Sequence, residues 1–68
     1  MKLKATNPHK CPVCGQTEFP FIGSNLICDV CKWEDDSVQE TEPDLAGGAN
    51  KYSLNENRKR WANGEYAK

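Results

Sequence analysis

Four cysteines arranged in two C-x-x-C pairs constrain this chain more than any other feature. Cys11 and Cys14 form the first pair, and Cys28 and Cys31 form the second after thirteen intervening residues. Two residues between paired cysteines let both sulfurs point into one tight turn, whose backbone N–H groups then face the sulfurs and stabilise negative charge. Two such pairs at this separation fit a tetrahedral four-thiolate metal site. We therefore predict that all four side chains bind one metal ion.

A metal ion would add stability that a chain of this size has difficulty supplying. The sequence has 68 residues, of which 37% are hydrophobic and 28% are charged. In domains shorter than about 70–80 residues, a single hydrophobic core rarely supplies more than about 3–5 kcal/mol of folding stability, so such domains usually add disulfides or a structural metal ion. The same small size excludes a large enclosed substrate pocket and a Rossmann or barrel enzyme. We predict a single zinc-ribbon-like domain over residues 1–68.

Other uses of the four thiols stay open. Two structural disulfides would need an oxidising compartment, and a bond within either C-x-x-C pair would be strained and close a very small loop. A thioredoxin-like redox pair uses one C-x-x-C at a helix start in a βαβ context, which this sequence lacks. Zinc and iron both accept four thiolates in a tetrahedron. Rubredoxin-like iron sites often have glycine after both pairs, whereas Lys32 follows the second pair here. We favour one Zn²⁺ per chain, with iron as a substitute.

The residues around the cysteines predict a short β-hairpin. Apolar residues in segments 18–22 and 25–29 flank a Gly-Ser pair, which is a signal for a two-residue turn. Pro20 restricts its strand to a sheet edge or to a strand start. This hairpin would bring the second cysteine pair back to the first, so we expect the ribbon to span about residues 9–33.

A helix is predicted near the carboxyl end, over about residues 54–62. Ser53, followed three residues later by a glutamate, matches a capping box, and an Asn-Gly pair marks the stop. Leu54 and Trp61 share one face of this helix by their spacing. An isolated helix of this length would be marginal in water, so we expect Trp61 to pack on the ribbon.

The stretch between the ribbon and the helix, about residues 34–52, is predicted to be an ordered, irregular loop. It is acidic and then glycine-rich, and Pro43 and the Gly-Gly pair interrupt any helix. Its carboxylates could hold a second cation, but they lack the regular spacing of a calcium loop, so we interpret them as solvated or as caps for loop N–H groups. Asp44 and Asn50, together with Asn55 and Asn57 beyond this stretch, are interpreted as turn residues that bond nearby backbone. The whole pattern predicts a small metal-stabilised α+β fold, with a zinc-ribbon or rubredoxin-like two-knuckle hairpin, the ordered loop and a C-terminal helix.

Several separate blocks of the sequence occur in a characteristic order. They are Cys11-Pro-Val-Cys14-Gly, Ile27-Cys-Asp-Val-Cys31-Lys-Trp33-Glu-Asp-Asp36, Pro43-Asp44, Gly47-Gly48-Ala-Asn50 and Ser53-Leu-Asn-Glu56-Asn-Arg58. Together they resemble the small bacterial cysteine-rich CPCC family over roughly residues 11–61. The family is named for a Cys-Pro-Cys-Cys run, and this chain has Val13 in place of the extra cysteine. The resemblance implies a metal-binding, zinc-ribbon-like mini-domain.

The remaining polar residues form no recognisable catalytic set. The sequence offers no serine–histidine pair, no phosphate loop and no paired-carboxylate pocket, so we expect a non-catalytic module and not an enzyme. His9 precedes the first cysteine pair by two residues. As a fifth ligand it would be redundant, and we interpret it as exposed or as a neighbour of the metal ligands.

Charge and hydropathy guide the expected partners and location. The formal net charge is −1, and the basic run Arg58-Lys59-Arg60 is short, which disfavours tight nucleic-acid binding at physiological salt. We expect a monomer with a protein partner. A nucleic-acid-binding zinc ribbon is the alternative, and a small redox or hydrolytic protein ranks behind it. No apolar run approaches the roughly 20 residues of a membrane span. The amino end lacks the features of a secretory signal, so we expect the cytoplasm, where thiols stay reduced.

Overall fold

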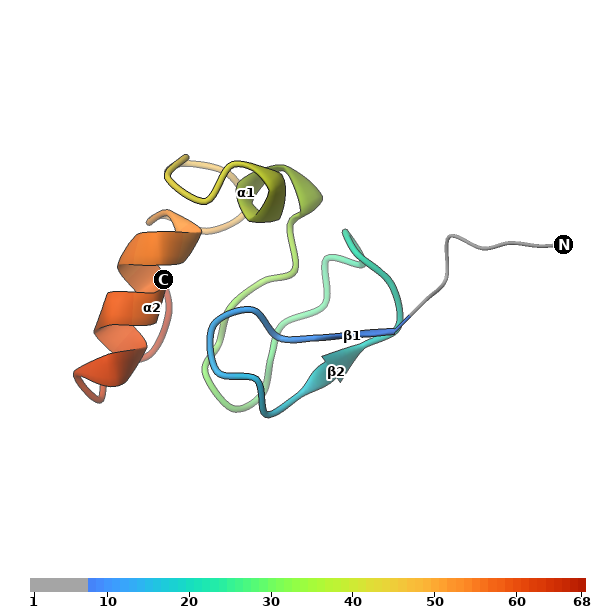
Figure 1. Ribbon diagram of the computed structural model, residues 1–68, viewed down its shortest axis with the longest axis horizontal. Helices are drawn as coiled ribbons and strands as arrows, with labels where there is room; N and C mark the ends of the chain where they lie inside the picture. Colours follow the sequence, from blue (N-terminus) through green and yellow to red (C-terminus); the bar gives the residue numbers. More distant parts are fainter. Residues whose placement is uncertain (1–7) are drawn as a thin grey trace, which may run out of the picture.

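Two very short strands pair on either side of the first cysteine turn. In the computed structural model, which describes residues 8–68, β1 (His9–Lys10) and β2 (Glu18–Phe19) run antiparallel. His9 lies opposite Phe19 in this register, and Lys10 lies opposite Glu18. Figure 1 shows helix α2 on the opposite side of the molecule from the hairpin, with the segment that carries the second cysteine pair between them. The arrangement is a small α+β fold with four clustered cysteines.

The expected hairpin between segments 18–22 and 25–29 is wrong in its pairing. A strand does begin at Glu18, but its partner is β1, which precedes the first cysteine pair. Pro20 follows the strand directly and has no N–H to donate to a ladder, so the pairing stops after two residues. The apolar side chains that follow Pro20 therefore lie in a turn instead of a strand.

A second antiparallel pairing surrounds the second cysteine pair. The N–H of Asn25 donates to the carbonyl of Asp35 at 3.1 Å, and the N–H of Asp35 donates to the carbonyl of Leu26 at 2.9 Å. Ile27 and Glu34 form an antiparallel bridge between the same two segments. Each cysteine pair thus lies at the closed end of its own pair of antiparallel segments.

A five-residue helix, α1 (Ser37–Thr41), interrupts the stretch that we expected to be an irregular loop. Asp36 caps this helix, because its Oδ1 accepts the N–H groups of Val38 at 2.8 Å and Gln39 at 3.2 Å. A carboxylate at this position also suits the positive end of a helix dipole. The acidic residue that precedes α1 is therefore a cap, as predicted for part of this segment, but the helix that it caps was not foreseen.

Buried amide side chains fasten this segment to the rest of the fold. Gln39 is fully buried, and its Nε2 donates to the carbonyls of Leu45, Asn50 and Tyr52 at 3.0, 3.2 and 3.3 Å. Its Oε1 accepts the backbone N–H and the Nδ2 group of Asn50 at 3.0 and 2.9 Å. Asn50 also bonds both backbone groups of Glu34 at 2.8 Å. We had expected Asn50 to bond nearby backbone. In the structure it instead joins segments that are distant in the sequence.

The loop can approach α1 this closely because Gly48 has no side chain. A Cβ at this position would lie 2.7 Å from Asp36 Oδ2 and 2.8 Å from Gln39 Cδ. The neighbouring N–H of Ala49 donates to Asp36 Oδ2 at 2.9 Å. The close contact therefore requires glycine for steric reasons.

Helix α2 (Leu54–Ala62) has the bounds that the sequence predicted. Ser53 caps it by accepting the N–H of Glu56 at 3.1 Å. Leu54 is buried, and Trp61 is half-buried and packs against the core, as expected from their shared face. Arg58 Nε donates to the carbonyl of Pro12 at 2.8 Å and so links α2 to the first cysteine turn. Neither helix in the described part of the chain is long and apolar enough to cross a membrane.

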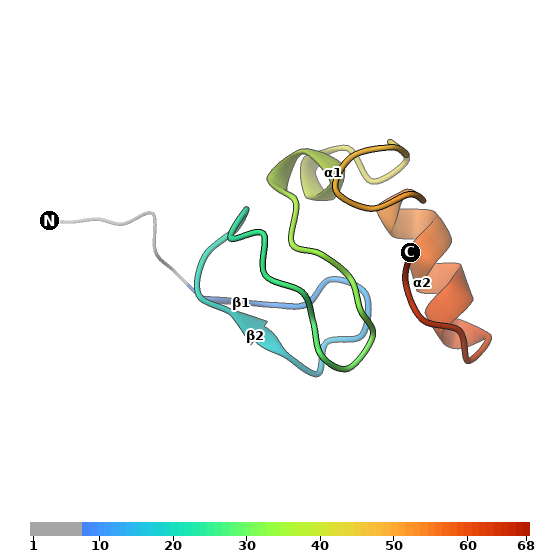
Figure 2. The same ribbon diagram turned by 180° about the vertical axis from the view of Figure 1, so that it is seen from behind.

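The segment after α2 turns back and lies between that helix and the second cysteine turn, as Figure 2 shows from behind. The N–H of Ala67 donates to the carbonyl of Cys31 at 2.7 Å, and the Ala67 side chain is part of the core. Asn57, which is fully buried, accepts the N–H of Lys68 at 2.9 Å and donates to its carbonyl at 3.0 Å. It also donates to the carbonyl of Tyr52 at 3.1 Å. The sequence did not predict that the segment after α2 packs against the core and the second cysteine turn.

The apolar core is small and is built around the cysteines. Trp33 and Phe19 are its largest buried side chains. The buried core consists of Cys11, Phe19, Cys28, Cys31, Trp33, Leu54 and Ala67.

We predict that Asn57→Ala destabilises the metal-loaded protein by about 2–4 kcal/mol, because the backbone groups of Tyr52 and Lys68 would lose buried partners. Asn55→Ala is the matched control, since Asn55 lies on the same helix and its side chain makes only exposed hydrogen bonds. The control should cost less than about 1 kcal/mol. Urea unfolding followed by circular dichroism measures both values. Equal midpoints for the two variants would contradict the role assigned to Asn57.

Candidate metal centre

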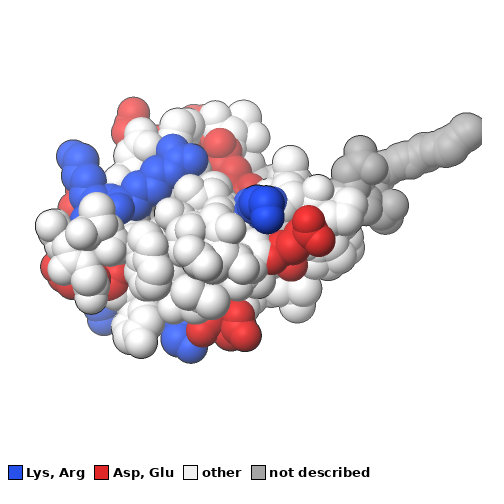
Figure 3. Space-filling view, turned by 60° about the horizontal axis from the view of Figure 1, so that its bottom comes forward, with Lys and Arg blue, Asp and Glu red and all other residues white. Residues whose placement is uncertain are grey.

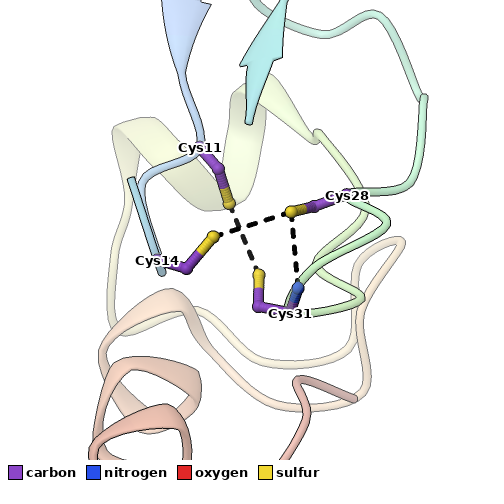
Figure 4. Close-up of side chains that lie close together, drawn as sticks. All are labelled: Cys11, Cys14, Cys28 and Cys31. Atoms are coloured by element: carbon purple, nitrogen blue, oxygen red, sulfur yellow. Dashed lines mark hydrogen bonds between the residues drawn. The ribbon is translucent and has the colours of Figure 1, made fainter. Parts of the chain in front are cut away.

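The four cysteine side chains converge on one point between the two turns, as Figure 4 shows. The Sγ atoms of Cys11 and Cys31 are 3.5 Å apart, those of Cys14 and Cys28 are 3.6 Å apart, and all four lie within 4.8 Å of one another. A disulfide requires about 2.05 Å, and all four cysteines, each in the described part of the chain, are free. A tetrahedral ion with metal–sulfur bonds of about 2.3 Å has sulfur–sulfur edges of about 3.8 Å. The cluster therefore has the size of a four-thiolate site and could bind a metal ion.

Backbone hydrogen bonds build the two turns alike. The N–H of Gly15 donates to the carbonyl of Cys11, and the N–H of Lys32 donates to the carbonyl of Cys28, both at 2.9 Å. Gly15 and Lys32 also share a left-handed backbone, with φ of 70° and 77°. Glycine adopts this conformation easily, whereas lysine does so at some cost. The two turns therefore have the same shape, and Lys32 does not set the second turn apart.

Backbone N–H groups face the sulfurs, as the spacing predicted. The N–H of Cys31 lies 3.4 Å from Cys28 Sγ, and the N–H of Gln16 lies 3.4 Å from Cys14 Sγ. Such contacts favour the thiolate over the thiol. They therefore suit sulfurs that share negative charge around a cation.

Burial opposes ionisation of the cluster in the absence of a cation. It raises the pKa of Cys11 to about 11, and it also raises the pKa of Cys31. Burial acts on Cys28 in the same direction, but hydrogen bonds to its sulfur, from the N–H of Cys31 among others, lower the pKa of Cys28 to about 6. A bound cation would supply the charge that lets the other thiols ionise.

A second group of metal-ligand types lies beside the hairpin. His9, Asp35 and Glu40 each offer one ligand atom, and these atoms lie within 4.8 Å of one another. His9 Nε2 is 3.2 Å from Asp35 Oδ1, and His9 Nδ1 is 3.8 Å from Glu40 Oε1. Asp35 is fully buried, and its Oδ2 accepts the N–H of Ser24 at 2.9 Å, so this carboxylate is not solvated but has the other role that we expected, that of a cap for a loop N–H group. No local motif could have indicated the whole group, because His9 is far in the sequence from Asp35 and Glu40.

The two carboxyl groups of this cluster differ in their ionisation. Burial, followed by the neighbouring Asp35 carboxyl, raises the pKa of Glu40 to about 7. Burial also disfavours charge on Asp35, but its contacts with Glu40, Ser24 and His9 outweigh burial and lower the pKa of Asp35. Trp33 Nε1 donates to Glu40 Oε2 at 3.2 Å. Because Trp33 lies two positions after Cys31, this bond connects the cluster of His9, Asp35 and Glu40 to the second cysteine pair.

The comparison with protein families decides the affiliation of the chain. The model of the family described as Cysteine-rich CPCC matches residues 9–64. The chain belongs to the cysteine-rich CPCC family. No curated protein matches it. The resemblance seen in the separate sequence blocks is therefore confirmed, and the matched region contains all four cysteines, His9 and both helices.

We predict that removal of metal unfolds this CPCC protein. Metal binding by four-thiolate peptides supplies on the order of 10–16 kcal/mol, which exceeds what a core of this size contributes. Excess chelator should therefore collapse the dispersed amide NMR spectrum, and a stoichiometric amount of metal ion should restore it. A spectrum that stays dispersed in excess chelator, with no metal left in the sample, would contradict this prediction.

Proposed function

We propose that this protein is a non-catalytic zinc-binding mini-domain of the zinc-ribbon type, which acts as a protein-interaction or adaptor module. The observation that supports this most directly is the convergence of four cysteine sulfurs from two similar turns. Four protein ligands fill a tetrahedral shell, and structural zinc sites have this closed arrangement, whereas catalytic sites keep one position open. In this proposal Cys11, Cys14, Cys28 and Cys31 hold one Zn²⁺ per chain.

Zinc suits the site because it has no redox chemistry of its own and favours a tetrahedral shell of thiolates. Iron also accepts four thiolates and is the substitute in this proposal. Free thiols persist where the compartment is reducing, so the cytoplasm is the proposed location.

A non-catalytic role follows from how the thiols are used. A thiolate that is bound to zinc is not available as a free nucleophile, and nucleophilic catalysis also needs an adjacent base. The four sulfurs point toward one another and not outward (Figure 4). This arrangement favours a structural centre over a disulfide reductase.

The surface supports a protein partner more than a nucleic acid. Lysines, arginines and carboxylates are interspersed with uncharged surface on the face drawn in Figure 3. Two of the three basic residues on α2 also make contacts within the protein, since Arg58 bonds the Pro12 carbonyl and Arg60 pairs with Glu65 at 3.0 Å. A nucleic-acid-binding zinc ribbon would need a free basic surface. The nucleic-acid-binding zinc ribbon is therefore the alternative to the proposed monomeric adaptor.

Exposed apolar side chains near the second cysteine pair also support a protein partner. Ile22, Leu26 and Ile27 are each more than half exposed, with exposed fractions of 58%, 51% and 60%. Contiguous exposed apolar surface is typical of interaction sites, and these three residues lie within one six-residue stretch of the chain. The loop that failed to form the expected hairpin is therefore the proposed contact region.

Elemental analysis tests the identity of the metal. Protein purified without chelator should retain about one zinc per chain after dialysis, and Cys31→Ser should lose most of it because a site with three thiolates binds more weakly. Asp29→Asn, which lies between the cysteines of the same pair, is the control and should retain the metal. Protein without stoichiometric metal would overturn the proposal, and stoichiometric iron would replace zinc in it.

The proposal also predicts no disulfide reductase activity in the metal-loaded protein, because its thiolates are held by the ion. An insulin-reduction assay under conditions in which zinc stays bound measures this, with a C-x-x-C oxidoreductase as the positive control. Efficient turnover by the loaded protein would show that the thiols serve in redox chemistry.

A further inference from the structure

One imidazole and two carboxylates meet in this fold, although the histidine is distant in the sequence from both acidic residues. His9 comes from β1, Asp35 follows the second cysteine turn, and Glu40 lies on α1. One ligand atom from each lies within 4.8 Å of the other two. Histidine nitrogen with carboxylate oxygens is a common donor set for zinc and related divalent transition-metal ions.

The contact between His9 and Asp35 is not a hydrogen bond, although the two atoms are close. His9 Nε2 and Asp35 Oδ1 are 3.2 Å apart, yet both are buried and neither has a hydrogen-bond partner among residues 8–68. The ring nitrogen therefore does not direct a proton at the oxygen. Two unpaired donor atoms side by side are what a shared metal ion requires, since bonds of about 2.0–2.2 Å place neighbouring ligand atoms about 3–3.5 Å apart.

Neighbouring residues hold all three ligands in place. Asp35 Oδ2 accepts the N–H of Ser24 at 2.9 Å and its Oγ–H at 2.7 Å, which leaves Oδ1 for the His9 side. The His9 ring lies against Phe19, with ring centroids 5.6 Å apart. Glu40 Oε2 is fixed by Trp33, and Glu40 Oε1 lies toward His9. Metal ligands are typically oriented by such supporting contacts.

We propose that His9, Asp35 and Glu40 form a second metal site, separate from the four cysteines, that binds a divalent transition-metal ion of the Zn²⁺ class. The His9 and Glu40 side chains are 21% and 11% exposed, so the cluster borders solvent, although His9 Nε2 and Asp35 Oδ1 themselves are buried. Three protein ligands leave a coordination position for water. Calcium and magnesium fit less well, because they prefer shells made of oxygen ligands.

A plain ion pair is the competing interpretation. A protonated His9 between two carboxylates would donate Nε2–H to Asp35 Oδ1, and the buried oxygen would then have a partner. The observed geometry lacks that bond. A bound ion instead satisfies both atoms at once, and it joins β1, the second antiparallel pair and α1.

His9 is the only histidine in the chain, so its ring reports the site directly. Protein that has retained its first zinc through dialysis is titrated with further Zn²⁺, while the imidazole nitrogens are followed by ¹⁵N NMR and the heat by calorimetry. We expect one additional equivalent to bind and to shift one ring nitrogen until it saturates. Calcium and magnesium at the same concentration should leave the ring nitrogens unchanged.

Matched variants assign the second equivalent to these residues. His9→Ala and Glu40→Gln should each weaken it by about tenfold or more, and glutamine at position 40 can still accept from Trp33. Glu42→Gln is the control, because Glu42 is an exposed carboxylate just after α1. Retention of the first zinc and a dispersed amide spectrum show that each variant folds.

The proposal is overturned if wild-type protein binds no second equivalent, if the His9 ring does not respond, or if all variants bind it equally. The first equivalent reports the four-cysteine centre, and the second reports the new site. The two proposals can therefore fail independently.

Discussion

The convergence of four sulfurs between two turns is the constraint on which the rest of this structure depends. The sheet formed by β1 and β2 has two residues in each strand, and a two-stranded sheet is marginal in water even when it is longer. Three of the seven buried core residues are themselves cysteines, so the core has little apolar surface apart from the site. Burial also raises the pKa of Cys11 to about 11 and raises the pKa of Cys31, so without a cation these two thiols resist ionisation, whereas the pKa of Cys28 is lowered. A bound cation would let the remaining thiolates form and would join the two turns, so local order and metal binding would then be one event.

Away from the cysteines, buried amides do what a larger apolar core would do in a bigger protein. Gln39 and Asn57 are fully buried, and each joins backbone groups from segments that share no secondary structure. A satisfied buried amide specifies one arrangement, because any other leaves polar groups without partners. The loop after α1 and the segment after α2 are therefore ordered by hydrogen bonds more than by apolar contacts. This explains how a chain with 37% hydrophobic residues keeps so much irregular backbone in place.

The sequence predicted what local signals encode and missed what depends on distant partners. The spacing of the cysteines, the helix at residues 54–62 and its Ser53 cap are local patterns, and the structure has the same helix bounds and cap. The strand pairing was wrong because a Gly-Ser pair between apolar runs predicts a turn without saying which segments pair. α1 has five residues, too few for a helical period to be visible. The cluster of His9, Asp35 and Glu40 comes from three segments, so only the fold reveals it.

Trp33 connects the two clusters. Its carbonyl accepts the N–H of Cys28 at 2.8 Å, so its backbone belongs to the second cysteine turn, while its ring nitrogen holds Glu40. His9 and Asp35 lie just outside the two turns, so their positions depend on how the turns are joined. The arrangement of the imidazole and carboxylates therefore depends on the turns that the four sulfurs join. A metal ion at the second cluster would then bind to a preorganised set of ligands and reinforce the contact between β1 and α1, without being needed to create the fold.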